Sequence, residues 1–210
     1  GITPFWTHPR AFLAVVLGLL TTACGPDREV QEDEREGRAA QAGASEVIES
    51  IADARPDEVG ILLENEYVRI LRFDVPAGED LPAHEGRRRV VYALADYELE
   101  WTESDQSPES RSWSQGDVHV HDAGVHALRN VGATTASFIV FERLDAALPT
   151  QVGDSRGGAD LPTGARLRLT EPDLQVLEVE LAPGEGQDMH PGGWRAIYSL
   201  TDYTIEWREG

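Results

Sequence analysis

Two stretches of this chain match each other without a gap when the sequence is shifted by 106 residues. Residues 68–101 align with residues 174–207, and 12 of the 34 paired positions are identical. Agreement at this level over an ungapped stretch indicates two copies of one folding unit. Because the first copy continues to Arg143 and the second stops at Gly210, we expect one complete unit followed by a truncated one, in a natural product longer than these 210 residues.

The composition of the repeated unit is typical of β-structure. Short runs rich in β-branched and aromatic residues alternate with clusters of Gly, Pro and Asp, which favours an all-β barrel or sandwich. Within the first copy, strands are predicted at residues 68–75, 89–94, 97–101, 117–121, 127–131 and 137–143.

Two sequence motifs lie within the first copy. Gly78 is followed six residues later by His84, and the stretch that begins at Gly116 closes with His126 and Asn130. Together they resemble the two cupin motifs, G-x5-H-x-H-x3–4-E-x6-G and G-x5-P-x-G-x2-H-x3-N, with one residue missing before His126. The resemblance implies an all-β, cupin-type double-stranded β-helix or jelly-roll barrel, complete in the first copy and truncated in the second.

The resemblance also raises the question of a metal site. In metal-binding cupins, three His and one Glu hold one divalent ion, and this ligand set suits iron, manganese, nickel or zinc. The chain keeps His84 and His126, but Gly86 replaces the second His, as Gly192 does in the second copy, and no carboxylate stands at the Glu position. Two imidazoles alone make a weak site, because a stable centre usually takes at least three protein ligands.

A third imidazole is a candidate to complete this set. His119 and His121 are two residues apart on a predicted strand, so both side chains project from one face. If that face is the barrel interior, His121 would join His84 and His126 as a metal ligand. The alternative is that His119 and His121 lie on the surface of the strand. His84 and His126 would then lie at the barrel mouth and be hydrogen-bonded to backbone. No residue is assigned a catalytic role.

Residues that recur in both copies are candidate ligand contacts inside the barrel. Arg89 and Arg195 carry the planar fork that suits a carboxylate, although a solvated arginine at a strand edge is the commoner case. Tyr92, Tyr198 and His190 are the other candidates, and aromatic residues on strands are more often core residues.

The chain begins with a segment typical of an export signal. The polar stretch 7–10 precedes the apolar run 11–20, which is too short to span a bilayer as a helix, and small residues lead into Cys24, the only cysteine. The pattern resembles a bacterial lipoprotein signal, in which the cysteine receives a lipid after cleavage. The alternative is a secretory signal with an incidental cysteine. We expect removal of residues 1–23 and a lipid anchor on Cys24, in the cell envelope on the periplasmic side or the outer surface.

The rest of the chain is predicted to fall into four segments. Residues 24–58 are acidic and poor in apolar side chains, which indicates a flexible tether. Residues 59–145 are predicted to form the first cupin domain, residues 146–166 a linker, and residues 167–210 a partial second domain.

The charge balance limits the partners of the chain. Acidic residues outnumber basic ones by 38 to 18, every basic residue is Arg, and the net charge is -20. Nucleic acid and anionic membrane surfaces would repel such a chain. The partners that remain are a membrane reached through the lipid on Cys24, a small molecule in the barrel, and a second copy in a homodimer.

Three functions are compatible with these features. The first is a lipid-anchored envelope bicupin that binds a small molecule without a complete metal site. The second is a divalent-metal-dependent cupin enzyme of the dioxygenase or isomerase kind, which would use His84 and His126. The third is a structural envelope lipoprotein that contacts its partners through the barrel edge.

Overall fold

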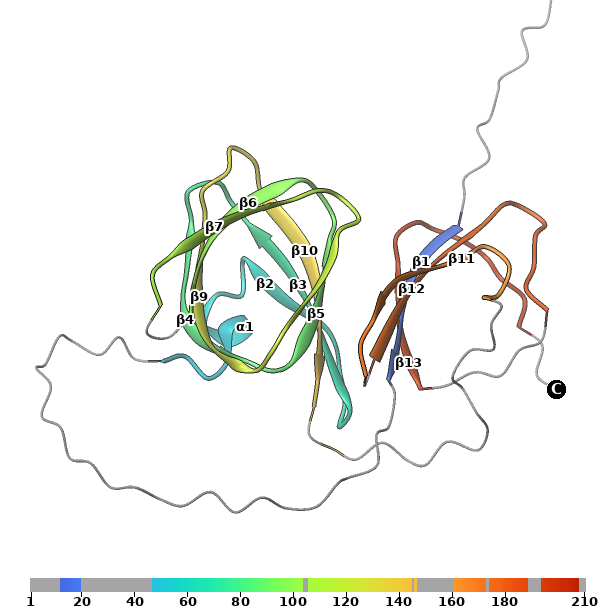
Figure 1. Ribbon diagram of the computed structural model, residues 1–210, viewed down its shortest axis with the longest axis horizontal. Helices are drawn as coiled ribbons and strands as arrows, with labels where there is room; N and C mark the ends of the chain where they lie inside the picture. The colour runs from blue at the N-terminus through green and yellow to red at the C-terminus, as the bar shows by residue number, and fades with distance from the viewer. Residues whose placement is uncertain are drawn as a thin grey trace, which may run out of the picture. The chain divides into compact units, whose positions relative to one another are not determined.

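The computed structural model describes residues 12–19, 47–103, 106–144, 146, 161–172, 174–188 and 194–207 (Figure 1). They form two compact units, and each is described by itself. The first unit runs from residue 47 to residue 146, and the second comprises residues 12–19 and 161–207. Nearly all regular structure is antiparallel β-sheet, which confirms the predicted fold class. None of the helical structure in these ranges is long and apolar enough to cross a membrane.

Two antiparallel sheets enclose the interior of the first unit (Figure 1). One sheet has the strand order β2-β3-β10-β5-β8 and the other has the order β4-β9-β6-β7. Strands far apart in the sequence, such as β3 and β10, are neighbours, as in a jelly-roll barrel. The strands are β2 (Val59–Glu64), β3 (Val68–Val75), β4 (Asp80–Gly86), β5 (Arg89–Ala93), β6 (Tyr97–Glu103), β7 (Glu109–Trp113), β8 (Val118–His121), β9 (Gly124–Asn130) and β10 (Ala136–Arg143).

The apolar core lies between these two sheets. Side chains alternate across a pleated strand, so every second residue of β3, β5 and β10 points into the barrel. Phe138 stacks on Phe73 with ring centroids 4.8 Å apart, and Tyr97 of the facing sheet packs against Phe138 at 5.3 Å. These contacts hold the two sheets together and so position the polar side chains that share the interior.

The folded unit begins before the boundary predicted at residue 58. Ile48 bridges to the edge strand β4: its N–H donates to the backbone oxygen of Ala83 at 3.0 Å, and its own oxygen accepts from the N–H of Glu85 at 3.1 Å. The short helix α1 (Ile51–Ala54) follows, and Ile51 is buried in the core. The acidic composition indicated a tether here, but the buried side chain of Ile51 and the two backbone bonds of Ile48 hold this segment against the barrel.

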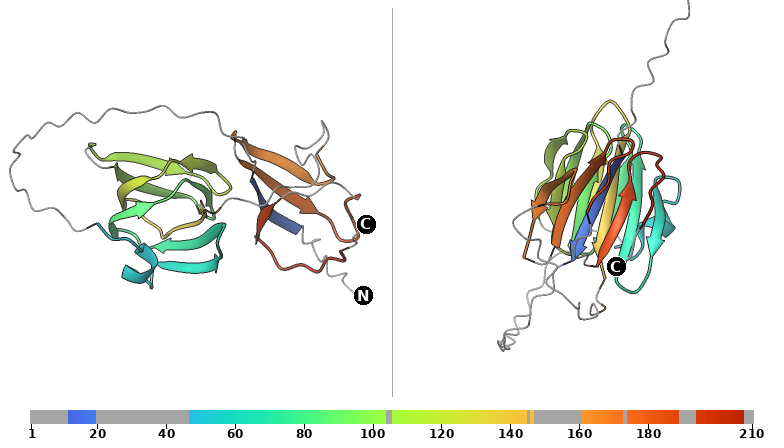
Figure 2. Two further views of the ribbon diagram at one scale, coloured as in Figure 1. Left: turned by 90° about the horizontal axis from the view of Figure 1, so that it is seen from below. Right: turned by 90° about the vertical axis from the view of Figure 1, so that its right-hand side faces the viewer.

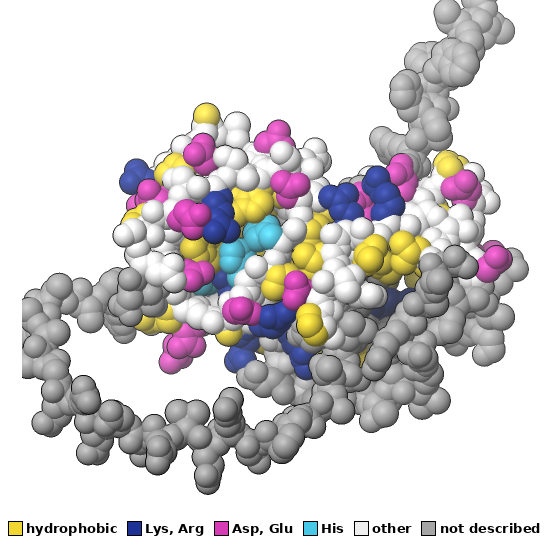
Figure 3. All heavy atoms as spheres, in the orientation of Figure 1, with side chains coloured by type: hydrophobic (Ala, Val, Ile, Leu, Met, Phe, Trp, Pro, Cys, Tyr) yellow, Lys and Arg dark blue, Asp and Glu magenta, His cyan; other side chains and the backbone are white. Residues whose placement is uncertain are grey.

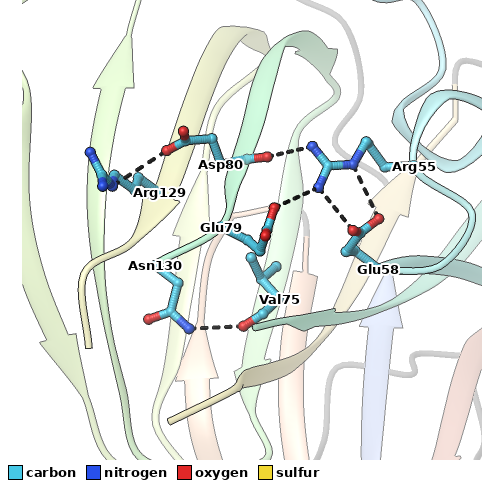
Figure 4. A network of polar contacts seen from close by, with 7 residues as sticks. All are labelled: Arg55, Glu58, Val75, Glu79, Asp80, Arg129 and Asn130. Carbon is cyan, nitrogen blue, oxygen red and sulfur yellow. Dashed lines mark hydrogen bonds and ion pairs between the residues drawn. The ribbon is translucent and has the colours of Figure 1, made fainter. Parts of the chain in front are cut away.

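A polar network connects α1 with the turn before β4 (Figure 4). Arg55 pairs with Glu79 at 3.4 Å and donates to the backbone oxygen of Asp80 at 2.6 Å. On the same side of the barrel, the buried side chain of Asn130 donates to the backbone oxygen of Val75 at 2.8 Å. The closing Asn of the second motif is therefore a structural residue, which joins the end of β9 to the end of β3.

The second unit repeats part of the first. Strands β11 (Ala165–Thr170), β12 (Leu174–Leu181) and β13 (Arg195–Ser199) have the bounds of β2, β3 and β5 moved by 106 residues. A register shift interrupts the β2–β3 pairing, and another interrupts the β11–β12 pairing at the corresponding place. The duplication in the sequence is thus a duplication of strands and of their irregularities.

The strand β1 (Phe12–Leu19) completes the sheet of the second unit. It lies between β12 and β13 and pairs antiparallel with both (Figure 2). In the first unit β10 has the corresponding position, between β3 and β5. The segment expected to be the apolar part of an export signal is therefore a strand here. Cys24 lies outside the described residues, so its lipid anchor stays a prediction.

Candidate ligand site

Five polar side chains predicted or considered from the motifs meet in one hollow inside the first unit. His84 lies on β4 and His126 on β9, whereas Arg89 lies on β5 and His119 and His121 lie on β8, in the facing sheet. Histidine side chains can be seen on the face of the molecule shown in Figure 3, among hydrophobic and basic ones. The prediction that His119 and His121 share one face is confirmed, because both line the hollow.

His84 and His126 are direct neighbours across the β4–β9 pair. Their rings lie 4.2 Å apart between centroids. Nδ1 of His84 is 2.8 Å from the backbone oxygen of Pro82, and Nδ1 of His126 is 3.4 Å from that of Gly124. A carbonyl oxygen only accepts, so each Nδ1 in such a bond carries the proton. Both rings are thus bonded to backbone, as one alternative predicted, but that alternative was wrong to place His119 and His121 on the surface.

The indole rings of Trp101 and Trp113 stack on histidine rings inside the hollow. The indole of Trp101 stacks on His126 at 4.3 Å and on His121 at 4.6 Å between centroids, and Trp113 stacks on His119 at 5.0 Å. Rings stacked face to face present their nitrogens at the edges of the stack and not toward one common point. In the described ranges, no three His, Cys, Asp or Glu side chains are grouped so that they could hold a metal ion.

Arg89 is buried inside the hollow with only 5% of its surface exposed. Its Nη1 donates to the backbone oxygens of Arg87 at 2.9 Å and Asp122 at 3.2 Å. Its Nη2 is 3.3 Å from both ring nitrogens of His126, and its guanidinium carbon is 5.4 Å from the centroid of Trp101. The commoner alternative, a solvated arginine at a strand edge, is wrong for this residue.

The lining of the hollow combines the guanidinium of Arg89 and the carboxylate of Glu142 with neutral imidazoles. Burial and then the charge of Arg89 lower the pKa of His119 to about 4, of His121 to about 3 and of His126 to about 2. Burial likewise lowers the pKa of His84. Burial lowers the pKa of Arg89 to about 10, so its guanidinium stays protonated at neutral pH. Arg89 therefore provides a fixed positive charge inside the hollow at neutral pH.

Gly86 decides how much space the arginine has. A Cβ added to Gly86 would lie 2.5 Å from Nη1 of Arg89 and 2.5 Å from Cε1 of His126, closer than real Cβ contacts come. The guanidinium thus fills the space in which a side chain at position 86 would begin. The residues present do not fit the four-ligand metal centre of the family, because one ligand position is occupied by a cation and another has no carboxylate.

The other predicted contacts are placed elsewhere. Tyr92 follows Val91 on β5 and is not part of the lining of the hollow. In the second unit Arg195 is exposed, with its guanidinium carbon 5.7 Å from the centroid of Trp207, which repeats the Arg89–Trp101 contact 106 residues later. Tyr198 is half-buried on β13, and His190 lies outside the described residues.

Sequence reasoning missed two members of the site. Trp101 was not among the predicted contacts, although its alternation with Tyr97 and Leu99 could have placed it on the inward face. Trp113 gave no such signal, since it reaches the interior through its pairing opposite Tyr97 in the β6–β7 register.

Comparison with known proteins identifies no family for this chain. No family model matches the chain, and no curated protein matches it. Among solved structures, a cupin domain from Bordetella pertussis Tohama I is 18% identical, with 48% of this chain and 98% of that chain covered and a TM-score of 0.39.

Two further structures have similar values. An RmlC-like cupin family protein from Methanocaldococcus jannaschii is 20% identical, with 53% and 91% covered and a TM-score of 0.35. A predicted oxalate decarboxylase from Thermotoga maritima is 22% identical, with 41% and 78% covered and a TM-score of 0.34. The likeness is to cupin-fold proteins. At these identities and TM-scores it carries no argument about function. The first unit is called the cupin-like unit from here on, after the resemblance of its two sequence motifs.

Proposed function

We propose that the cupin-like unit binds a small molecule in its hollow, without a complete metal centre. The observation that carries this proposal is the set of polar side chains gathered inside an otherwise apolar interior, which is the usual composition of a ligand site. Nδ1 of His119 is buried and has no hydrogen-bond partner in the described part of the chain. Buried polar atoms of this kind are rare unless a water or a ligand completes them.

The size of the hollow limits what it can accept. The open space is about 30 Å³, which is room for about two water molecules on this measure. A small molecule, or one functional group of a larger one, therefore fits better than a bulky ligand.

Ligand-induced stabilisation tests the proposal directly. Thermal unfolding of the full chain would be followed with a panel of small acids, amides, alcohols and sugars. A compound present at a hundred times its Kd stabilises the folded state by about 2.7 kcal/mol. We expect at least one compound to raise the unfolding temperature of the chain and to do so less in the His119→Phe variant, which keeps the ring and loses the nitrogens. A panel without any hit would contradict the proposal.

Metal content separates this proposal from the metalloenzyme alternative. The chain would be incubated with iron, manganese, nickel or zinc and desalted before metal analysis. Stoichiometric metal that is lost in His84→Ala and His126→Ala would favour the enzyme, and the proposal predicts metal far below one ion per chain.

We further propose that the protein is a lipid-anchored envelope bicupin. The export-type segment before Cys24 supports the anchor, and the strands repeated in β11, β12 and β13 support a second unit of the same kind. Metabolic labelling with a radioactive fatty acid tests the anchor: the label should enter the wild-type chain and be absent from Cys24→Ser. Light scattering tests the alternative of a structural protein that dimerises, since that protein would have the mass of two chains.

A further inference from the structure

We propose that the ligand of the cupin-like unit is a carboxylate-bearing anion, and that Arg89 supplies the positive charge that a metal ion supplies in metal-binding cupins. This inference rests on the proposed function, because it names the chemical class of the molecule that the hollow accepts. It comes from one exchange within the barrel, in which Gly86 stands where the cupin motif has its second histidine and the guanidinium of Arg89 fills the space over that glycine.

The first step is the position of the guanidinium. It lies directly over Gly86, within 2.5–2.9 Å of where a Cβ would be, and its Nη2 is 3.3 Å from the ring of His126. A divalent cation bound by His126 would lie close to this charge and be repelled by it. The site can hold the fixed guanidinium or a metal ion, and the structure has the guanidinium.

The second step is the set of groups that already use the charge of Arg89. Nη1 donates to two backbone oxygens, which are neutral. Glu142 is the carboxylate that lines the hollow, but its oxygens pair with Arg69 at 3.7 Å and accept from the N–H of Arg87 at 3.3 Å. The charges of Glu142 and Glu103 act on Arg89 from a distance, but its Nη1 donates its hydrogen bonds to neutral oxygens. A carboxylate that accepts directly from a buried guanidinium gains more than one that binds a solvated guanidinium, because charge-assisted hydrogen bonds strengthen out of water.

The third step is the wall beside the charge. Trp101 provides an aromatic face next to the guanidinium, and the imidazoles around it are neutral at physiological pH, so nothing in this wall adds a second charge. A planar carboxylate matches a planar fork flanked by flat rings. The net charge of the chain opposes anions at long range, but at physiological salt such repulsion is screened beyond about 8 Å.

Calorimetric titration of the full chain with malonate and with its uncharged isostere malonamide tests the inference. We expect malonate to bind and malonamide to bind at least tenfold more weakly. Arg89→Met keeps a long apolar side chain and should weaken malonate binding by roughly ten- to a hundredfold, as the loss of a hydrogen bond to a charged group does. Arg129→Met, at an exposed position of β9 in the facing sheet, is the matched control and should bind like the wild type.

A second variant covers the case in which Arg89→Met does not fold. Gly86→Ala removes no charge, but its Cβ must displace the guanidinium, so it should also weaken malonate binding. The double variant Gly86→His, Arg89→Met returns the imidazole of the family pattern and removes the cation. We expect it to bind Co²⁺, with the visible absorption of a nitrogen-ligated ion, whereas the wild-type chain should not.

Two results would overturn the inference and leave small-molecule binding intact. One is malonamide bound as tightly as malonate with Arg89→Met unchanged, and the other is a neutral compound of the thermal panel bound independently of Arg89. Stoichiometric Co²⁺ on the wild-type chain would overturn the inference as well. Absence of binding by every compound of that panel would instead overturn the proposed function.

Discussion

Gly86 and Arg89 lie three positions apart on either side of the turn between β4 and β5, and each makes sense only with the other. Gly86 has no Cβ, and the guanidinium of Arg89 occupies the space that a Cβ would need. Any other residue at position 86 would place its Cβ about 2.5 Å from Nη1 of Arg89 and so displace the guanidinium. Burial, and then the charge of this arginine, lowers the pKa of His121 and His126, so both rings are neutral at neutral pH. The absence of a side chain at position 86 thus leaves room for the charge of Arg89 beside His126.

Acid should weaken the fold through these imidazoles. The pKa values of His119, His121 and His126 are about 4, 3 and 2 in the folded chain, whereas an unfolded histidine titrates near pH 6.5. The unfolded chain therefore takes up protons first as the pH falls. The free energy of unfolding should decrease from about pH 6.5 downwards, and the contribution of each histidine is lost as the pH passes its folded value.

Urea unfolding at pH 7 and at pH 5, above most carboxylate titration, measures this effect. The decrease should be smaller in His119→Phe than in the wild type, because one of the titrating groups is gone. Equal decreases in the two chains would show that the histidine does not titrate differently on unfolding.

At the scale of elements, the barrel is held at one end by side chain to backbone bonds and not by apolar packing alone. Asn130 at the end of β9 donates to the backbone oxygens of Val75 and Thr134, and its own oxygen accepts from the N–H of Gly132. One side chain thus connects the ends of two strands with the loop that precedes β10.

Asn130→Ala should destabilise the cupin-like unit by roughly 1–3 kcal/mol, because it leaves the backbone oxygen of the buried Val75 without this donor. Chemical denaturation measures the change. Arg129→Ala, its exposed neighbour, should change the free energy of unfolding by less than about 0.5 kcal/mol. A similar loss in both variants would mean that the Asn130 bonds contribute little.

The sheet of the second unit depends on a strand from the other end of the sequence. Deletion of residues 1–23 removes β1 and leaves β12 and β13 without the neighbour between them. Hydrogen exchange should then show a loss of amide protection in Leu174–Leu181 and unchanged protection in Val68–Val75, its counterpart in the cupin-like unit. Retained protection in β12 would mean that the sheet does not need β1. Signal cleavage, if it occurs, would have the same consequence.

For the whole molecule, the net charge of -20 makes self-repulsion a general term in stability. In several ion pairs, such as Arg111 with Glu109, both side chains are more than half exposed. Such pairs contribute little to the free energy of unfolding, so screening them with salt costs little stability. Raising the NaCl concentration from 20 to 200 mM should therefore raise the midpoint of thermal unfolding, with an equal osmolality of sucrose as the control. A lower midpoint in salt would mean that attractive pairs outweigh the repulsion.

Strands could be predicted best where the residues of the strand itself carry the β-type pattern. Residues 68–75 were expected as a strand with the bounds that β3 has, and the spacing of His119 and His121 correctly placed both on one face. The strands β2, β4 and β7 were missed. They are polar, proline-containing or irregular, and they become strands because a neighbouring strand supplies their hydrogen bonds, which is a nonlocal condition.

The sequence alone determined the duplication, the β-rich fold and the pairing of His84 with His126 in one motif-bearing barrel, because repeats, strand periodicity and motif spacing are properties of the order of residues. Only the tertiary structure decided that Arg89 occupies the space over Gly86, that Trp101 stacks on two imidazoles, and that β1 takes the place of β10 in the second unit. Each of these depends on which strands become neighbours, and side chains from facing sheets compete for space in a way that spacing along the chain does not encode.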